Sequence, residues 1–368
     1  MATIATIGDG CRLMDVRSGA SGEAGEARDG SEPVVSADSM NARGPASGNG
    51  SEQSGELVAL GVIEKMLPAP PEGEVWAGDD AALMATGDGP LLVSVDLSIE
   101  GVHFDLGLSS LGDVGWKAVA SAVSDIAAMG GDASRAFIGI SCGREIDIAC
   151  LYEGLVSAAG TFGCPIAGGD MSDGGRLVIS VTVTGSLLPA AVPVLRSGAH
   201  PGDQLFITGS VGGSAYGLRL LRQASGDWNA SSHTAAENRA VAKYRRPVAR
   251  IEEGRTARLA GASAMMDISD GLAIDLHRMM TASRTGAVLD LVPVFEGATM
   301  EEALGGGEDY ELLMATADPA GLLESFHALG LAPPLYVGMC TDPSTGVMFD
   351  GDPLPPYGYT HAFSGSVG

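Results

Sequence analysis

Residues 91–131, LLVSVDLSIEGVHFDLGLSSLGDVGWKAVASAVSDIAAMGG, contain two different hydrophobic periods in one short stretch. Residues 91–99 are rich in β-branched and apolar side chains, which is typical of a strand. Residues 111–131 place apolar side chains at helical spacing, and Gly130 and Gly131 end that pattern as glycines often do at a helix C-terminus. The stretch therefore predicts a strand followed by an amphipathic helix, which is a unit of an α/β domain.

The same alternation extends on both sides of this stretch. Pro189 and Pro193 mark a boundary, so we expect one α/β domain over residues 56–190 and a second over 191–368. The further expected elements are strands at 135–142 and 176–185, a helix at 146–163, a turn and strand at 196–209, a glycine-rich loop and helix at 210–223, a strand, acidic turn and helix at 264–280, and a glycine turn and strand at 305–316.

The N-terminal part differs in composition from the rest. Residues 1–55 contain no aromatic residue and no lysine, and from Ser18 onward they are mostly small and polar. Such a segment cannot bury enough apolar surface to offset the entropy of ordering, which predicts a disordered extension. An alternative is that translation starts downstream, for instance at Met40. Residues 56–67, ELVALGVIEKML, have helical spacing and precede Pro68.

Composition excludes several function classes. The 368 residues carry a formal net charge of −25, which argues against a nucleic-acid backbone or an anionic membrane surface as partner. Lysine occurs only three times and never in a P-loop. The five cysteines form no CxxC pair, and neither a signal peptide nor a transmembrane-length apolar run is visible. We expect reduced thiols and a cytoplasmic location.

Several aspartates lie where charge is costly. Asp79 and Asp80 are adjacent, so their mutual repulsion calls for bulk water or a cation. Asp96 interrupts an apolar strand. Asp125 shares one helical line with apolar residues, so it needs a partner if it is buried. The alternatives for Asp125 are exposure to solvent or pairing with an arginine.

Two glycine-containing motifs carry further acids. AGGDMSDGG, residues 167–175, contains Asp170, and MDISDG, residues 266–271, places Asp267 and Asp270 around Ser269 at a helix start. Glycines permit close approach of a ligand, and a helix N-terminus suits phosphate, although Asx-turns or N-caps also explain each motif singly. Taken together, hard oxygen ligands without a Cys/His cluster favour Mg²⁺ over zinc. A third reading is that these acids are surface charge that contributes to solubility.

Seven ordered motifs resemble the thiamine-monophosphate kinases, which are related to aminoimidazole ribonucleotide synthetase. The motifs are GDDAAL, SVDLSIEGVHF, SDIAAMGG, IAGGD, RSGAHPGD, DISDGL and GGGEDYEL, and the resemblance covers roughly residues 56–363. The resemblance implies a two-domain PurM-like α/β (α+β) architecture, with a ferredoxin-like N-terminal domain and an α+β C-terminal domain. It also implies a homodimer that pairs through the sheets of the first domains.

The resemblance further implies phosphorylation of thiamine monophosphate to thiamine diphosphate by ATP, with several Mg²⁺ ions. The implied contacts to metal are Asp80, Ser94, Val95, Asp96, Asp125, Asp170, Asp267 and Asp270; those to ATP are Gly169, Asp170, Arg196 and Ser269; those to thiamine monophosphate are His103, Glu308 and one of Tyr357 and Tyr359. Val95 departs from the Ser/Thr-Thr-Asp pattern common in the family, so only its backbone carbonyl could ligate. We expect no catalytic general base, because the acceptor phosphate is already ionised at neutral pH.

Two other activities stay open at this point. One is an ATP-using ligase similar to aminoimidazole ribonucleotide synthetase. The motifs EGVHF and GGGEDYEL argue against it, because they resemble the kinases specifically. The other is a nucleotide-binding protein without turnover, against which the full set of aspartates speaks.

Overall fold

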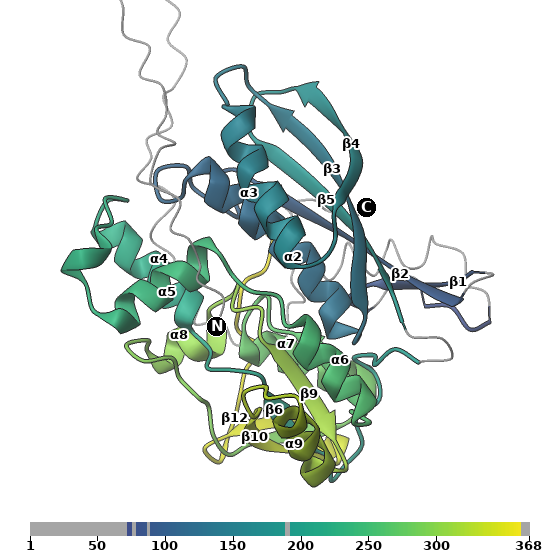
Figure 1. Ribbon diagram of the computed structural model, residues 1–368. Coiled ribbons are helices and arrows are strands. Elements are labelled where there is room, and N and C mark those ends of the chain that lie inside the picture. Colours follow the sequence, from purple (N-terminus) through teal and green to yellow (C-terminus); the bar gives the residue numbers. More distant parts are fainter. Residues whose placement is uncertain (1–71, 76–78, 87–88, 188–191, 362–368) are drawn as a thin grey trace, which may run out of the picture.

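The chain folds into two α/β units, each built around its own sheet (Figure 1). The computed structural model describes residues 72–75, 79–86, 89–187 and 192–361, and the extension expected over 1–55 and the helix expected over 56–67 lie outside these ranges. Among the described residues, no helix is both long and apolar enough to cross a membrane. The α/β class expected from the sequence is confirmed.

The first unit is a five-stranded sheet with two helices. The strand order is β1-β2-β5-β3-β4; β3 and β4 run parallel, and the other neighbours run antiparallel. Its elements are β1 (Ala82–Thr86), β2 (Gly89–Ile99), α2 (Leu111–Ala128), β3 (Asp132–Cys142), α3 (Ile148–Thr161), β4 (Ile166–Asp173) and β5 (Val178–Ser186).

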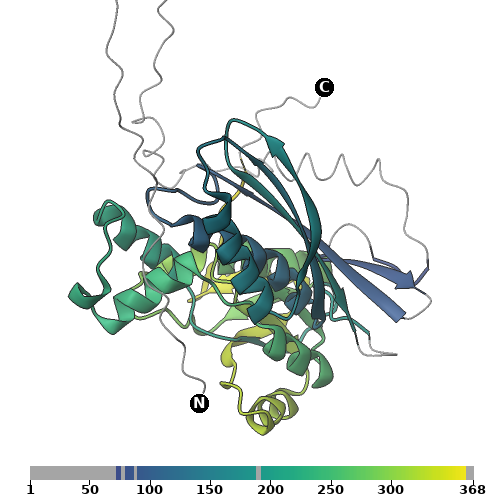
Figure 2. The same ribbon diagram turned by 45° about the horizontal axis from the view of Figure 1, so that its top comes forward.

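Local sequence signals account for the helices of this unit. Ser110 and Asp113 form a reciprocal capping box at the start of α2, and Gly130 follows its end with a φ of 70°. The helices α2 and α3 pack closely because Gly154 has no side chain: a Cβ there would lie 1.9 Å from the carbonyl oxygen of Gly112. Both helices cover the same face of the sheet (Figures 1 and 2).

The second unit contains a seven-stranded sheet with the order β12-β11-β8-β10-β6-β9-β7. Separate apolar clusters form its core, two of them built on residues of the sheet and one beneath α4 and α5. Its elements are β6 (Gln204–Ile207), α4 (Gly213–Gln223), η2 (Ala230–Ser232), α5 (Ala235–Arg245), α6 (Ile251–Leu259), β7 (Ala264–Asp267), α7 (Leu272–Ser283), β8 (Gly286–Leu289), α8 (Met300–Gly305), β9 (Leu312–Thr316), α9 (Pro319–Ala328), β10 (Leu335–Thr341), η3 (Pro343–Thr345), β11 (Val347–Phe349) and β12 (Asp352–Pro353).

Helix α2 joins the two units, since it packs on the first sheet and also contacts β7 and α6 (Figure 1). The approach of α6 is close at Gly254, where a Cβ would lie 2.1 Å from the carbonyl oxygen of Ala127. Side chains on the side of α2 that faces away from the first sheet therefore contact the second unit. This contact positions the candidate active site.

The structure differs from the sequence-based expectation at β4. No strand was expected at its residues, IAGGDMSD, because glycine and aspartate are rare in strands and an Asx-turn or N-cap explains the motif locally. They instead form an edge strand that pairs in parallel with β3. The pairing partner lies more than twenty residues away in sequence, so no local pattern indicates it.

The face of the first sheet that α2 and α3 leave uncovered carries exposed apolar side chains. Val95 and Leu97 of β2 are 64% and 49% exposed, and Phe137 of β3 is 43% exposed. No helix among the described residues covers this face (Figure 2).

Candidate active site

Three carboxylates from distant parts of the chain meet at the contact between the two units. Asp80 precedes β1, Asp125 lies in α2, and Asp267 is the last residue of β7. One oxygen from each lies within 4.8 Å of the others. Asp125 is half-buried, and the Ser94 hydroxyl donates a 2.5 Å hydrogen bond to it.

These carboxylates lie in an environment that opposes ionisation. Burial is the main cause that raises the pKa of Asp80 and of Asp125 well above the usual value, and neighbouring carboxylates raise both further. Burial also raises the pKa of Asp267 to about 6, although the Ser124 hydroxyl donates a 2.7 Å hydrogen bond to it. A bound cation would relieve this repulsion.

The donor set fits a hard divalent cation. Oδ2 of Asp80 is buried and has no hydrogen-bond partner among the described residues, which is costly for a carboxylate oxygen. Carboxylate and hydroxyl oxygens, without any thiolate or imidazole in the cluster, are the ligands that Mg²⁺ prefers. The residues present therefore fit Mg²⁺.

Arg196 pairs with the adjacent acids Asp79 and Asp80 and offsets part of their repulsion. Its Nη2 donates a 2.9 Å hydrogen bond to Oδ1 of Asp80, and its backbone N–H donates a 3.2 Å hydrogen bond to Oδ2 of Asp79. The sequence called for water or a cation beside this pair, and the Arg196 guanidinium is one such cation. Asp80 consequently has one oxygen paired with Arg196 and one unpaired oxygen beside Asp125 and Asp267.

Strand β2 places Ser94 and Asp96 on one face and Val95 on the other. Ser94 is buried and bonds to Asp125, whereas the side chain of Val95 lies on the exposed face of the sheet. Asp96 accepts a 2.7 Å hydrogen bond from the N–H of Leu97, and its charge contributes to the raised pKa of Asp125. A role of Val95 in metal binding is thus limited to its carbonyl oxygen.

The turn between β7 and α7 is organised by Asp275, which the sequence analysis did not single out. Oδ2 of this fully buried carboxylate accepts hydrogen bonds of 3.1, 3.0 and 3.2 Å from the N–H groups of Ser269, Asp270 and Gly271. Arg278 donates to both Asp275 and Asp270. Asp270 is therefore held by an arginine, with its side chain 28% exposed beside the cluster.

Replacing Asp275 by alanine should lower the free energy of unfolding by about 3 kcal/mol, because three N–H groups, one of them buried, and a guanidinium lose their acceptor. Urea unfolding followed by circular dichroism measures this. The matched control is Asp318→Ala, which removes an N-cap of α9 and should cost only about 1 kcal/mol. Equal losses in the two variants would contradict the organising role of Asp275.

In residues 308–311, two buried acids, Asp309 and Glu311, hold the segment in place, and the other two residues, Glu308 and Tyr310, alternate with them. Asp309 accepts hydrogen bonds from the N–H groups of Gly212 and Ser214 at the start of α4, and Glu311 accepts from Lys243, Arg250 and Thr208. These two acids therefore fix the backbone of Glu308 and Tyr310.

Glu308 and Tyr310, the other two residues of this segment, have positive φ values of 66° and 50°. Such backbone is strained for non-glycine residues and persists only where the surroundings hold it. Glu308 pairs with Lys117 at 2.6 Å. Burial raises the pKa of Tyr310, and the charges of Glu308, Asp96, Asp267 and Asp125 raise it further. Lys117 and Tyr310 were not predicted from the sequence.

The C-terminal segment reaches the other end of the site. His103 accepts a 3.0 Å hydrogen bond at Nδ1 from the N–H of Ile99, and its ring meets that of His361 edge-on at 5.4 Å. Tyr359 contacts His361 in turn and donates its backbone N–H to the carbonyl of Asp270. Tyr357 instead packs against Gly305 and the core of the second unit.

Gly169 and Asp170 do not join the carboxylate cluster within one chain. They lie on edge strand β4, three strands from β2, which is about 14 Å at the usual strand spacing. They line a hollow of about 540 Å³ together with Ile148 and Tyr152. Their predicted contact with ATP therefore requires a ligand or a second chain that reaches across this distance.

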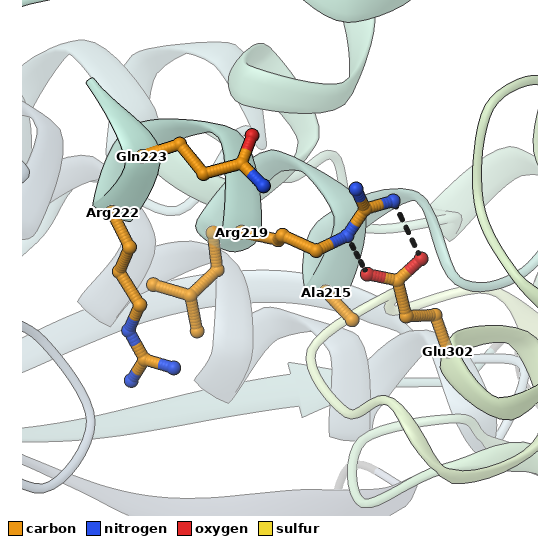
Figure 3. Close-up of a pocket in the computed structure, with 6 residues that line it drawn as sticks. Ala215, Arg219, Arg222, Gln223 and Glu302 are labelled. Atoms are coloured by element: carbon orange, nitrogen blue, oxygen red, sulfur yellow. Dashed lines mark hydrogen bonds and ion pairs between the residues drawn. The ribbon is translucent and has the colours of Figure 1, made fainter. Parts of the chain in front are cut away.

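A separate hollow of about 530 Å³ lies over α4, lined by Ala215, Arg219, Arg222 and neighbouring side chains (Figure 3). Arg219 forms two hydrogen bonds to the carboxylate of Glu302, at 2.6 and 3.1 Å, so its charge is already paired. This hollow has none of the acidic residues of the candidate active site.

Both units of the chain match protein-family models of the same family. The model of the AIR synthase related protein, N-terminal domain, matches residues 78–187, and that of the C-terminal domain matches residues 200–347. The two units are thus the two domains of an AIR synthase related protein.

Its relatives narrow the class. The thiamine-monophosphate kinase of Bacillus subtilis (strain 168) is 37% identical over 252 residues, which cover 65% of this chain and 76% of the relative. That of Methanospirillum hungatei is 33% identical over 295 residues, covering 78% and 94%. A solved structure described as AaThiL complexed with AMPPCP and TMP is 29% identical, has a TM-score of 0.72, and covers 83% of this chain and 96% of that chain. The chain belongs to the thiamine-monophosphate kinase family, and the expected PurM-like two-domain fold is confirmed.

Proposed function

We propose that this chain transfers the γ-phosphoryl group of ATP to thiamine monophosphate and so forms thiamine diphosphate. Membership of the thiamine-monophosphate kinase family supports the activity, as does the similarity to a structure complexed with AMPPCP and TMP. The observation that carries the proposal in this chain is the cluster of Asp80, Asp125 and Asp267, which contains one buried carboxylate oxygen without a hydrogen-bond partner among the described residues. Phosphoryl transfer needs positioning and charge neutralisation, and a cation site supplies both.

Mg²⁺ is the proposed cofactor. The residues that would hold it are Asp80, Asp125 and Asp267, with Ser94, Asp96, the carbonyl of Val95, Asp270 and Asp170 as further candidates. When bound, Mg²⁺ would offset the negative charge of the phosphate oxygens during transfer. Ser94 and Ser124 donate hydrogen bonds to two of the carboxylates and so orient them.

The protein groups divide into a donor side and an acceptor side. The turn at 267–271 presents Ser269 and Asp270 at the start of α7, where the positive end of the helix dipole favours phosphate. Arg196 holds Asp79 and Asp80 in place rather than standing free for ATP in this conformation. His103, Glu308 and Tyr359 form the acceptor side, and Tyr152 offers a ring beside Gly169 on which the base of ATP could stack.

Transfer is proposed to be direct, by in-line attack of the acceptor phosphate oxygen on the γ-phosphorus of ATP. The phosphate oxygen forms the new P–O bond, the bond to the β-phosphate oxygen breaks, and ADP leaves. No proton has to be removed from the acceptor, because a phosphate monoester is ionised at neutral pH. This makes His103 a positioning residue.

Product analysis separates this function from its alternatives. With ATP, Mg²⁺ and thiamine monophosphate, the kinase forms thiamine diphosphate and ADP in equal amounts. A ligase relative would not phosphorylate thiamine monophosphate, and a protein without turnover would bind ATP and form no ADP.

A homodimer that pairs through the first sheets is proposed as well. The face formed by Val95, Leu97 and Phe137 is apolar and exposed in the single chain, and exposed apolar patches of this kind mark association surfaces.

Phe137→Glu should therefore convert the dimer to a monomer, because a buried unpaired carboxylate at the interface is costly. Analytical ultracentrifugation gives the mass in solution. The matched control is Leu259→Glu, which introduces the same charge at a 62% exposed leucine of α6 in the second unit. A Phe137→Glu variant with the mass of the wild type would overturn the proposed interface.

A further inference from the structure

Lys117 is a buried lysine whose ammonium group contacts the acceptor side of the site. It lies in α2 and is only 6% exposed. Its Nζ lies 2.6 Å from Oε2 of Glu308, 3.5 Å from the carbonyl oxygen of His103, and 4.0 Å from the ring centroid of Tyr244. These three contacts account for the three N–H groups of the ammonium.

The position of Lys117 on α2 relates it to the carboxylate cluster. Residues 117, 121, 124 and 125 fall on one side of a helix with 3.6 residues per turn. Ser124 and Asp125 reach the cluster, and Lys117 lies about 12 Å away along the helix axis at the usual rise per residue. The same helix face thus carries the cation-binding end and the acceptor end of the site.

We propose that Lys117 is a positioning residue for thiamine monophosphate, because it ties the side chain of Glu308 to the turn that carries His103. This inference rests on the proposed kinase function. Glu308 belongs to the second unit and His103 to the first, so Lys117 bridges acceptor contacts from both units through one group.

Two observations favour a role in positioning over a role in stability alone. Glu308 has a strained φ of 66° and a side chain that is 27% exposed, so without Lys117 its carboxylate would be free to turn into solvent. Lys117 also places a positive charge beside His103 and Glu308, the two proposed contacts to an anionic substrate. A charge-assisted hydrogen bond at 2.6 Å fixes the geometry more strongly than a neutral one.

Lys243 provides a matched control within the same chain. It also lies in a helix, its Nζ is also 2.6 Å from a glutamate of the 308–311 segment, and that glutamate, Glu311, is 1% exposed. The Lys243–Glu311 pair anchors the segment but does not contact His103 or the carboxylate cluster in any interaction of the described residues. A purely structural lysine in this segment should behave like Lys243.

The experiment compares Lys117→Met with Lys243→Met in steady-state assays with each substrate varied. Lys117→Met should raise the KM for thiamine monophosphate by roughly tenfold or more, while the KM for ATP stays within about twofold. Lys243→Met should lower the melting temperature and change the two KM values equally or not at all. An unchanged KM for thiamine monophosphate in Lys117→Met, or equal changes in both KM values, would overturn the inference.

A double-mutant cycle covers the case in which Lys117→Met folds poorly. Lys117→Gln and Glu308→Gln are measured singly and together, since a glutamine pair keeps a neutral hydrogen bond in place of the ion pair. The inference predicts that the double variant has a KM for thiamine monophosphate no higher than that of the worse single variant. Multiplicative effects would contradict it. If the wild type forms no thiamine diphosphate, the proposed function fails and Lys117 is not the cause.

Discussion

Asp125→Asn is expected to lower kcat/KM for phosphorylation of thiamine monophosphate by at least about a hundredfold. Asp125 is the member of the carboxylate cluster that α2 contributes at the contact between the two units. An amide keeps the shape of the side chain and the hydrogen bond with Ser94, but it removes the charge that binds a cation. The loss should therefore be in turnover and in the Mg²⁺ requirement rather than in folding.

The stability of the same variant distinguishes a functional carboxylate from a structural one. Burial and three neighbouring carboxylates raise the pKa of Asp125, so its charge destabilises the metal-free protein at neutral pH. Asp125→Asn should have a higher melting temperature than the wild type in EDTA. The control is Asp132→Asn, which removes a partly exposed ion pair with Arg255 and should retain activity. A less stable but fully active Asp125→Asn variant would reject the metal site.

Removal of divalent cations should abolish turnover and reverse the pH dependence of stability. The carboxyl of Asp267 has a pKa of about 6 in the folded metal-free protein, against about 3.9 in an unfolded chain. Between these values the folded state binds more protons than the unfolded state, so stability in EDTA falls as pH rises. For Asp267 the effect is roughly 3 kcal/mol, and the raised pKa values of Asp80 and Asp125 act in the same direction.

Mg²⁺ reverses the pH dependence of the stability, because it binds the ionised carboxylates. The increase in melting temperature caused by Mg²⁺ should be small at pH 5 and grow as pH rises through 6. Burial also raises the pKa of Asp275 to about 7 and that of Asp309 to about 6, but neither belongs to the cluster, so they contribute equally with and without the ion. The difference between melting curves with Mg²⁺ and with EDTA isolates the cluster. A Mg²⁺ effect that is independent of pH would contradict this assignment.

The sequence predicted elements whose signals are local. The strand around Ser94 and Asp96 and the helix that carries Asp125 follow from hydrophobic period and capping residues, and both are confirmed. Strand β4 was not predicted, because its glycines are compatible with a strand only through pairing with β3. Local patterns indicate elements, whereas pairing between distant strands depends on the whole fold.

The candidate site shows the same limit. Asp125 could be singled out because a charge interrupts an apolar helical line, Asp80 because two acids are adjacent, and Asp267 because it lies in an acidic motif at a helix start. Lys117 gave no signal, because a lysine on a helix is ordinarily solvent-exposed and its partner Glu308 is 191 residues away. Asp275 gave none either, since an acid in the first turn of a helix is common and its three N–H partners depend on a turn formed only in the folded chain.

The most direct test of the central claim is chromatographic detection of thiamine diphosphate after incubation of the wild type and Asp125→Asn with ATP, Mg²⁺ and thiamine monophosphate. We predict that the wild type forms thiamine diphosphate and ADP in equal amounts, that EDTA abolishes this, and that Asp125→Asn forms almost none. Absence of thiamine diphosphate with the wild type, while ATP still binds, would contradict the account and favour a ligase relative or a nucleotide-binding protein without turnover.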